Sequence, residues 1–369
     1  MHLERLSLIN FKNIAQIDME LSPSVNCFLG NNGEGKTNLL DAVHYLSYTK
    51  SNFNVQDSYN VKFDQPFFVL QGDFILNEEN TSIYCGYKSG EKKQFKKNKK
   101  NYSKLADHIG LLPTVIITPN DISLVTEGSE VRRKFLDSLI SQFDRGYLQN
   151  LMQYNRLMLQ RSALLKQFIE VGATDLTLLD VLDGQLESPA QEIYEVRKEF
   201  LAEFMPIFNS FYSDISSAKE SVELVYQSQL NEGSFKGVIA LARTKDLRSG
   251  HNTCGLHKDD LLFTIGEKPL KRFGSQGQQK TYLIALKLAT FEVIKSRKGF
   301  APVLLLDDIF DKLDDSRIGY LLNQIAKGKV GQTFITDTSL EKVPKVLSDL
   351  GIEFKAFEIE NGDVKSNLN

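Results

Sequence analysis

The sequence has few cysteines, no tryptophan and no long apolar run. Its three cysteines, Cys27, Cys85 and Cys254, are odd in number, far apart and without C-x-x-C spacing. This pattern argues against a disulfide framework and a zinc site, and it is typical of a reducing cytoplasm. No apolar stretch approaches the length of a membrane span, and the charged opening MHLERLSLIN lacks the apolar core of a signal peptide. We therefore expect a cytoplasmic protein.

Charge is distributed unevenly along the 369-residue chain, which is long enough for a large α/β core and a second lobe. The net charge is −3, but residues 92–104 contain seven lysines and no acidic residue. The rest of the chain therefore carries −10, the difference between −3 and +7. This basic segment on an acidic protein is either solvated surface or a contact with a polyanion.

Hydrophobic periodicity predicts an α/β chain with a helical insertion. Apolar and polar residues alternate through the first thirty positions, which predicts strands, and a helix is expected at 36–47. Helical spacing dominates from about 120 to 217. Pro189 and Pro206 are expected to break or kink the second helical segment there. Further strands are expected at 67–76, 81–88, 113–118, 302–307 and 332–336.

Alternation returns after VELVYQS, and a further helix is expected at 276–297. The last residues, NGDVKSNLN, have the composition of a frayed polar end. We therefore predict a discontinuous α/β head formed by residues 1–118 and 221–369, into which a helical lobe is inserted at 119–220.

Residues 30–37 read GNNGEGKT and fit the phosphate-loop pattern G-x-x-x-x-G-K-[ST] in full. A strand precedes this loop and a helix follows it, which argues against a plain glycine-rich turn. The glycines let backbone N–H groups face phosphate oxygens, Lys36 reaches the β- and γ-phosphates, and the Thr37 hydroxyl binds Mg²⁺. The expected ATP-binding residues are Gly30, Asn31, Asn32, Gly33, Glu34, Gly35, Lys36 and Thr37.

Two aspartates end the apolar run APVLLLDDIF at 301–310. Asp307 is the expected second metal ligand for Mg²⁺, and Asp308 is the candidate catalytic residue that orients or deprotonates the attacking water. The alternative is a pair of capping carboxylates at a strand end. Beside a complete phosphate loop, the pair indicates an ATP or GTP site.

A second glycine-rich stretch, GSQGQQK at 274–280, opens an apolar helix. Ser275 is expected at its N-cap, where the hydroxyl and the first N–H groups form an anion site. The alternative is a cap and nothing more. Because the phosphate loop already binds phosphate in the same chain, we expect this second site to face the γ-phosphate held by another copy of the protein.

At this point the chain resembles the ABC-type ATPases. Residues Ser275, Gln276, Gly277 and Gln278 are similar to their signature motif, and FDKLD at 310–314, with Asp311 and Asp314, is similar to their D-loop. Within that group, LSLINFKNI, ITPNDISLV…RRKFLD and GLHKDDLLF resemble the SMC-like RecF family of bacterial recombination mediators. The resemblance covers nearly the whole chain and implies an α/β ABC-type P-loop ATPase head with an inserted α-helical lobe.

The chain departs from the family pattern at several positions. Lys12 stands where the family's first strand ends in arginine, so a bidentate guanidinium contact is lost. The histidine that ABC transporters place after the last core strand is missing, which leaves Thr336 or Asp337 as substitutes. The role of Gln71 as a Q-loop glutamine stays open. His257 is interpreted as structural or as a D-loop contact, since no second metal ligand lies nearby in sequence.

The resemblance also implies a function. It implies an ATP-dependent homodimer on DNA at gaps or strand junctions, with ATP and Mg²⁺ as cofactors and slow hydrolysis resetting the dimer, so that any enzyme activity is a weak DNA-stimulated ATPase. The implied partners are the mediator proteins RecO and RecR and the RecA recombinase, with support of the SOS response. None of these partners is visible in the residue chemistry.

Two other functions compete with this one. An ABC-type ATPase that energises a membrane transporter is disfavoured because the signature lies 245 positions after Gly30, the difference between 275 and 30. The other is a small-molecule P-loop kinase. Such a kinase does not need a signature helix that acts on another copy of the chain, and it would need a pocket for a phosphate acceptor.

The lysine-rich segment is the candidate DNA contact. Seven like charges in thirteen residues repel one another unless a polyanion is near, and Phe95 and Tyr102 are candidates for stacking on bases. A soluble, solvated hairpin is the equal alternative. Arg132 and Arg133 are either phosphate contacts or structural ion pairs. The candidate DNA-binding lysines are Lys92, Lys93, Lys96, Lys97, Lys99, Lys100 and Lys104.

Overall fold

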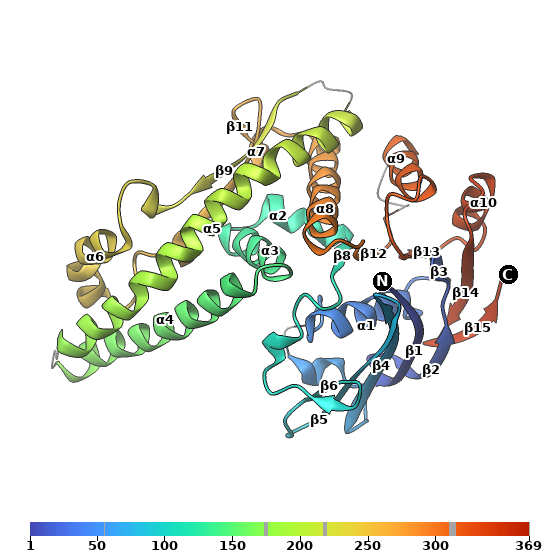
Figure 1. Cartoon of the computed structure of the whole chain (residues 1–369), viewed down its shortest axis with the longest axis horizontal. Coiled ribbons are helices and arrows are strands. Elements are labelled where there is room, and N and C mark those ends of the chain that lie inside the picture. Colours follow the sequence, from blue (N-terminus) through green and yellow to red (C-terminus); the bar gives the residue numbers. More distant parts are fainter. Residues whose placement is uncertain (55, 173–175, 217–219, 310–314, 369) are drawn as a thin grey trace. The chain divides into compact units, whose positions relative to one another are not determined.

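The computed structural model describes residues 1–54, 56–172, 176–216, 220–309 and 315–368 (Figure 1). They form two compact units. One comprises Met1–Asp121 and Leu286–Asn369, and the other comprises Ile122–Ala285. The helical lobe was expected to begin at residue 119, three positions before the second unit. Residues 221–285, which were expected in the head, pack with the helices of the second unit.

The first unit contains a six-stranded sheet in the order β15-β14-β3-β13-β12-β8. All neighbours in it are parallel except β14 and β15. Every residue of β3, β8, β12 and β13 is buried, which explains why their sequences are mainly apolar and do not alternate with polar residues. The bounds are Val25–Leu29 for β3, Thr114–Ile117 for β8, Val303–Leu306 for β12, Thr333–Asp337 for β13, Phe354–Glu360 for β14 and Asp363–Asn367 for β15.

A second sheet of this unit is antiparallel, in the order β2-β1-β4-β5-β6-β7. Helix α1, Lys36–Tyr48, packs against strands of both sheets. The rings of Phe11, Tyr45 and Phe68 meet edge to face in the core between them. The strands are β1 His2–Phe11, β2 Ile14–Glu20, β4 Phe67–Leu76, β5 Glu79–Lys88, β6 Gln94–Lys97 and β7 Lys100–Asn101, and the remaining helices are α9 Asp315–Ala326 and α10 Lys342–Asp349.

The C-terminal residues are ordered as a hairpin, so the prediction of a frayed polar end was wrong. Strand β15 pairs antiparallel with β14, and Asn361 and Gly362 form the turn with φ of 54° and 77°. Asn-Gly is the preferred sequence for a two-residue turn with two positive φ angles, because neither residue strains there. The polar composition hid this signal.

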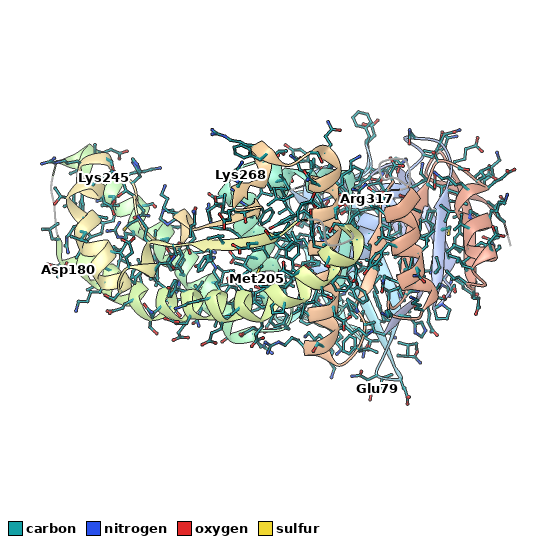
Figure 2. The ribbon with its side chains drawn as sticks, turned by 90° about the horizontal axis from the view of Figure 1, so that it is seen from above. Glu79, Asp180, Met205, Lys245, Lys268 and Arg317 are labelled. Carbon is teal, nitrogen blue, oxygen red and sulfur yellow. The ribbon has the colours of Figure 1, made fainter. Side chains whose placement is uncertain are left out.

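The second unit is mainly helical. Helices α4, Arg145–Val171, and α5, Leu176–Ser216, lie side by side, and α6, Phe235–Ser249, packs on both (Figure 1). Asp180 of α5 and Lys245 of α6 lie at the same end of this unit (Figure 2). The smaller elements are α2 Ser123–Thr126, α3 Ser129–Ser141, α7 Leu270–Phe273, β9 Val222–Gln227, β10 Asp260–Ile265 and β11 Lys268–Pro269, and α8 Gln276–Lys298 begins here.

Pro189 and Pro206 were expected to break or kink this segment, and helix α5 runs through both of them without a break. A proline removes one backbone hydrogen bond from a helix interior. Pro189 is buried, and Ile193, Phe200 and Phe204 of the same helix are buried as well. Burial of this long apolar face stabilises α5 by more than the lost hydrogen bonds cost.

Two buried arginines join the helices of the second unit. Arg161 of α4 binds Asp183 of α5 and Asp246 of α6, each at 2.6 Å. Arg197 of α5 contacts Asp137 at 2.7 Å and Asp259 at 2.9 Å. Breaking such a buried pair leaves an uncompensated charge, so these networks fix the packing of the unit.

Within the described ranges, no helix has both the length and the apolarity needed to cross a bilayer.

Candidate nucleotide-binding site

The phosphate loop joins β3 to α1, as the sequence predicts. The Lys36 ammonium lies inside the loop and donates hydrogen bonds to the carbonyls of Gly30, at 2.6 Å, and Asn31, at 2.7 Å. Burial lowers the pKa of Lys36, and the nearby carboxylates, Asp308 first, oppose that shift. A partly desolvated ammonium within a loop of this shape is well placed for an anion.

Gly35 stands at the N-cap of α1 with φ of 112°, and no side chain caps the helix. A Cβ at this position would lie 2.8 Å from the Asn13 side chain, so only glycine fits both the space and the backbone angle. An uncapped helix N-terminus with a lysine in its first turn is an anion site. The loop residues therefore fit the phosphate groups of a nucleotide.

Thr37 and Asp307 meet at the carboxyl ends of the parallel strands. The Thr37 hydroxyl donates to Asp307 at 2.8 Å, and the Thr336 hydroxyl donates to the same carboxylate oxygen at 2.9 Å. Burial raises the pKa of the Asp307 carboxyl, and these two hydrogen bonds partly oppose the shift. A hydroxyl and a carboxylate are oxygen ligands of the kind Mg²⁺ takes beside phosphates, so the pair fits that ion.

Asp308 follows directly and has a positive φ of 47°. Its backbone N–H donates to the Thr336 hydroxyl oxygen at 2.8 Å. Thr336 thus contacts both acidic residues, through one oxygen atom. Residues 310–314, which include Asp311 and Asp314 of the expected D-loop, lie outside the described residues.

Asp337, the other candidate for the missing histidine, ends β13. One of its carboxylate oxygens accepts from the Ser339 N–H at 3.0 Å, and among the described residues the other is buried without a hydrogen-bond partner. Its backbone carbonyl accepts from the N–H of Gly30 at 3.2 Å. Thr336 contacts both residues of the acidic pair, and the Asp337 carbonyl contacts the first residue of the loop.

The signature-like residues belong to the second unit, at the start of α8. The Ser275 hydroxyl accepts from the Gln278 N–H at 3.2 Å, and the Gln278 amide oxygen accepts from the Ser275 N–H at 2.7 Å. This reciprocal pair is a capping box, which bears out Ser275 as N-cap. Ser275 and Gln276 are exposed, so the helix terminus faces solvent.

Lys12 has an internal partner. Its ammonium lies 2.6 Å from the fully buried Asp41 of α1, and it lies over the rings of Phe11 and Phe53. Gln71 lies in the middle of β4, opposite Ser7 and Tyr84. Neither the ion pair of Lys12 nor the strand position of Gln71 indicates a contact with a nucleotide.

His257 and the lobe arginines have structural contacts within the second unit. The His257 ring lies 3.3 Å from the Asn252 carbonyl, and burial lowers its pKa. Arg132 makes a bidentate pair with Asp260, and Arg133 donates to the Asp259 carbonyl. Among the described residues, no group of three or more histidines, cysteines and acidic residues can hold a metal ion.

The lysine-rich segment forms β6, β7 and the turn between them. Lys97 and Lys100 lie directly opposite each other across that turn, a destabilising arrangement of like charges. Lys92, Lys99, Lys100 and Lys104 are exposed. Lys93 instead forms an ion pair with Asp57 at 2.8 Å and donates to the Thr49 carbonyl, so its charge is used within the fold.

The aromatic residues of this segment are also internal. Phe95 is buried, and Tyr102 and His108 pack against it. The expected stacking of Phe95 on bases is therefore wrong, because its alternation along β6 points it into the core.

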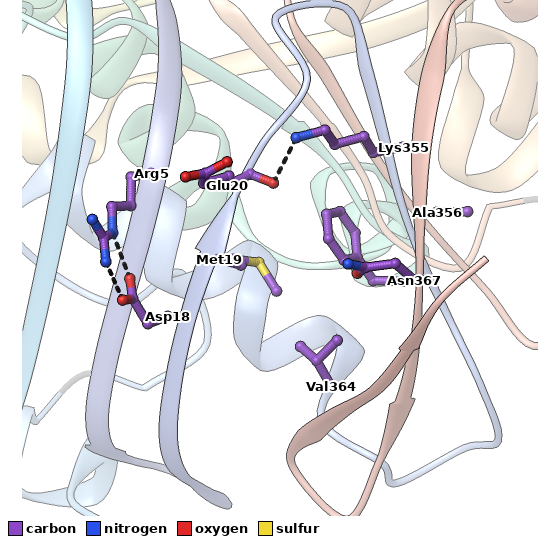
Figure 3. Close-up of a pocket in the computed structure, with 9 residues that line it drawn as sticks. Arg5, Asp18, Met19, Glu20, Lys355, Ala356, Val364 and Asn367 are labelled. Carbon is purple, nitrogen blue, oxygen red and sulfur yellow. Dashed lines mark hydrogen bonds and ion pairs between the residues drawn. The ribbon is translucent and has the colours of Figure 1, made fainter. Parts of the chain in front are cut away.

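A cavity of about 500 Å³ lies between the edge strands β2 and β15, lined also by residues of β1 and β14 (Figure 3). Arg5, Asp18 and Lys355 in its lining are paired with protein atoms. Arg5 forms a bidentate ion pair with Asp18, which lowers the pKa of Asp18 to about 2, and the Lys355 ammonium donates to the Glu20 carbonyl at 3.2 Å. The cavity does not include the phosphate loop.

Comparison with known proteins identifies the family. Residues 2–357 match the RecF/RecN/SMC N terminal domain. A DNA replication and repair protein RecF from Phocaeicola vulgatus is 47% identical over 366 residues, which cover 99% of this chain and 98% of that protein. This chain belongs to the RecF family. The RecF of Flavobacterium johnsoniae is 45% identical over 359 residues, which cover 97% of this chain and 100% of that protein.

Solved structures agree with this assignment. The recombination mediator protein RecF-ATP of the RecFOR pathway superposes with a TM-score of 0.90 at 31% identity, covering 100% of this chain and 98% of that chain. An Smc head from Pyrococcus furiosus has a TM-score of 0.58 at 16% identity, covering 100% of this chain and 96% of that one, a likeness of fold alone. The fold is the ABC-type α/β head with a helical lobe found in RecF proteins, and the transporter alternative is not supported.

Proposed function

We propose that this protein acts in DNA replication and recombinational repair as an ATP-dependent DNA-binding protein. The observation that carries the proposal is the meeting of Lys36, Thr37, Asp307 and Asp308 at one edge of a parallel sheet, in a chain of the RecF family. ATP is the nucleotide we propose, because the related RecF structure is of a RecF-ATP form.

The loop and the residues beside it have distinct roles in this proposal. The backbone N–H groups of residues 30–37 and the Lys36 ammonium bind the phosphates. Thr37 and Asp307 would hold Mg²⁺, and a bound Mg²⁺ would neutralise negative charge on the phosphates. Asp308 orients the attacking water and accepts its proton. Thr336 positions the Asp307 carboxylate and the Asp308 backbone through its hydroxyl group.

The helix start at Ser275 provides the second half of the proposed site. Its N–H groups and hydroxyl, with Gln276, Gly277 and Gln278, would bind the γ-phosphate held by a second copy of the chain. ATP would then join two copies, with the D-loop residues Asp311 and Asp314 at the joint. Hydrolysis would separate the copies again.

The DNA contact we propose is the β6–β7 hairpin. The exposed lysines Lys92, Lys99, Lys100 and Lys104 contact phosphates, with half-buried Lys96 and Lys97 beside them. The opposed Lys97 and Lys100 support this role, since a polyanion relieves their repulsion. In the cytoplasm, RecO, RecR and RecA would be the partners at gapped DNA, with support of the SOS response.

DNA affinity measured with and without ATP·Mg²⁺ tests the proposal. Fluorescence anisotropy of a labelled gapped duplex is expected to show at least tenfold tighter binding with ATP·Mg²⁺. The Asp308→Asn variant is expected to keep this tight binding and to hydrolyse ATP at least tenfold more slowly than the parent. DNA affinity that is the same with and without ATP would contradict the proposal. A hydrolysis rate in Asp308→Asn equal to that of the parent would show that Asp308 does not orient the attacking water.

A further inference from the structure

The turn between β14 and β15 contacts the outer side of the phosphate loop. The Gly362 N–H donates to the Glu34 carbonyl at 2.8 Å, and the Asn361 N–H donates to the Glu34 carboxylate. A single loop residue therefore accepts two hydrogen bonds from adjacent residues that lie more than 300 positions further along the chain.

These contacts satisfy groups that a phosphate loop turns away from its ligand. When the N–H groups of such a loop face an anion, the carbonyls that do not bind the Lys36 ammonium face outward and need other donors. The Glu34 carbonyl has the Gly362 N–H, and the Gly33 carbonyl has the Asn13 side-chain amide at 3.4 Å. The Asn13 side chain is held in turn by Asn38 of α1 at 2.7 Å.

The backbones pack without room for one methyl group. A Cβ added at Gly362 would lie 2.7 Å from the Asn13 carbonyl oxygen, and one added at Gly30 would lie 2.3 Å from the Ile359 carbonyl oxygen. Gly362 also has φ of 77°. The hairpin, Asn13 and the loop therefore form one close-packed cluster.

The carboxylate of Glu34 needs a fixed position for an electrostatic reason. It lies in a loop built to bind anions, and a carboxylate free to turn toward phosphate oxygens would repel them. The Asn361 N–H holds it on the outer side.

We propose that the Asn361–Gly362 turn is a positioning element of the phosphate loop, which holds the outward carbonyl and carboxylate of Glu34 so that the loop is preset for phosphate groups. Asn13 supports the neighbouring carbonyl in the same way. This inference rests on the proposed nucleotide binding. It adds that the Asn361–Gly362 turn holds the loop in the conformation that binds phosphate.

The substitution Gly362→Ala tests the turn, with Gly351→Ala as the matched control. Gly351 has φ of 66°, and a Cβ there has no atom within 4 Å, so the control strains the backbone without pushing on a neighbour. Both variants are expected to lose thermal stability, since alanine is strained at either φ, and Gly362→Ala is expected to lose more because its Cβ also meets the Asn13 carbonyl oxygen. Only Gly362→Ala is expected to weaken ATP and pyrophosphate binding, both at least tenfold, when measured by titration calorimetry on the full chain.

Glu34 gives a second, milder test. Glutamine keeps an oxygen that accepts from the Asn361 N–H, whereas alanine does not, and both remove the negative charge. We expect Glu34→Gln to bind ATP at least threefold more tightly than Glu34→Ala. If Gly362→Ala does not fold, the comparison of Glu34→Gln with Glu34→Ala tests the positioning role by itself.

The outcomes separate this inference from the proposed function. Equal ATP and pyrophosphate affinities in Gly362→Ala and Gly351→Ala, or equal ATP affinities in the two Glu34 variants, would overturn the positioning role while leaving nucleotide binding intact. A parent protein that binds neither ATP nor pyrophosphate would overturn the proposed function, and the positioning role with it.

Discussion

The Thr37 hydroxyl lies 2.8 Å from a carboxylate oxygen of Asp307, although 270 positions separate the two residues in the chain. Thr37 follows β3 and Asp307 follows β12, and the two strands are separated in the sheet by β13 alone. The parallel order brings their carboxyl ends to one edge. Thr336, near the end of β13, donates a second hydrogen bond to the same carboxylate oxygen.

Replacing Lys36 by alanine is expected to weaken ATP binding about 10- to 100-fold, because a hydrogen bond to a charged group is worth about 1.5–3 kcal/mol. Titration calorimetry with ATP·Mg²⁺ measures the effect. The exposed Lys88, which pairs with Glu91, is the matched control, and Lys88→Ala is expected to bind ATP like the parent. Equal ATP affinity in the two variants would show that Lys36 does not contribute to ATP binding.

Replacing Asp307 by asparagine is expected to stabilise the protein without nucleotide and Mg²⁺. Burial raises the pKa of this carboxyl, and a group with a raised pKa stabilises the fold only at low pH, a contribution lost as the pH rises through the folded-state pKa. Asparagine carries no charge and still accepts from both threonines. The unfolding temperature at pH 7 should therefore rise by about 1–3 °C.

The gain in Asp307→Asn should shrink as the pH falls, because the parent carboxyl then becomes neutral. The same variant should lose the extra stabilisation that Mg²⁺ adds to ATP binding. Asp64→Asn, at an exposed position with φ of 59°, is the control and should change neither quantity. A lower unfolding temperature for Asp307→Asn at pH 7 would contradict the account.

Replacing Ser275 by arginine is expected to abolish ATP-dependent dimerisation while ATP binding by the monomer stays nearly intact. A bulky side chain at the helix start blocks an approaching phosphate and cannot cap, and cap loss alone costs about 1 kcal/mol. Ser234→Arg removes the N-cap of α6 in the same unit and is the control, with dimerisation retained. A Ser275→Arg protein that still doubles its mass with ATP would leave Ser275 as a cap only.

Replacing Lys96, Lys97, Lys99 and Lys100 by glutamine is expected to make DNA binding less dependent on salt. Each phosphate contact contributes about −0.9 to the slope of log K against log salt for duplex DNA. The slope should therefore become shallower by roughly 2 for Lys99 and Lys100 alone, and by roughly 3–4 if Lys96 and Lys97 touch phosphates as well. Four exposed lysines elsewhere in the same unit, Lys88, Lys327, Lys342 and Lys345, provide the control. An unchanged slope in the hairpin variant would make the hairpin a solvated surface.

Replacing His108 by glutamine is expected to reduce acid destabilisation. Its ring contacts the Leu46 carbonyl at 2.7 Å and the Tyr102 hydroxyl at 3.0 Å, and burial lowers its pKa to about 4. The folded chain therefore binds this proton less readily than the unfolded chain, so stability is lost as the pH falls from about 6.5 to 4. The slope of unfolding temperature against pH in this range should flatten, and the exposed His251→Gln should leave it unchanged.

The local sequence predicts the site residues that follow buried strands. Gly30, Lys36, Thr37 and Asp307 occupy the expected places because a phosphate loop and an acidic strand end are local patterns with a fixed meaning in a parallel sheet. Ser275 is a cap for the same reason, since its capping box spans only four residues.

Sequence patterns do not predict the contacts that depend on chain topology. Nothing near Glu34 indicates that Asn361 and Gly362 donate to it, or that Thr336 contacts both acidic residues. Phe95 is a candidate for stacking on bases from its lysine neighbours, but strand alternation turns it inward. The Asn-Gly turn of the last hairpin is a local signal that polar composition concealed.

The most direct test of the central claim is the molar mass in solution with and without ATP·Mg²⁺, measured by light scattering on the full chain. The account predicts a species of 41.8 kDa without nucleotide and one of twice that mass with ATP·Mg²⁺, and it predicts that DNA increases the fraction of the larger species. A mass that stays at 41.8 kDa at saturating ATP·Mg²⁺, with and without DNA, would contradict the proposal that ATP joins two copies of this protein.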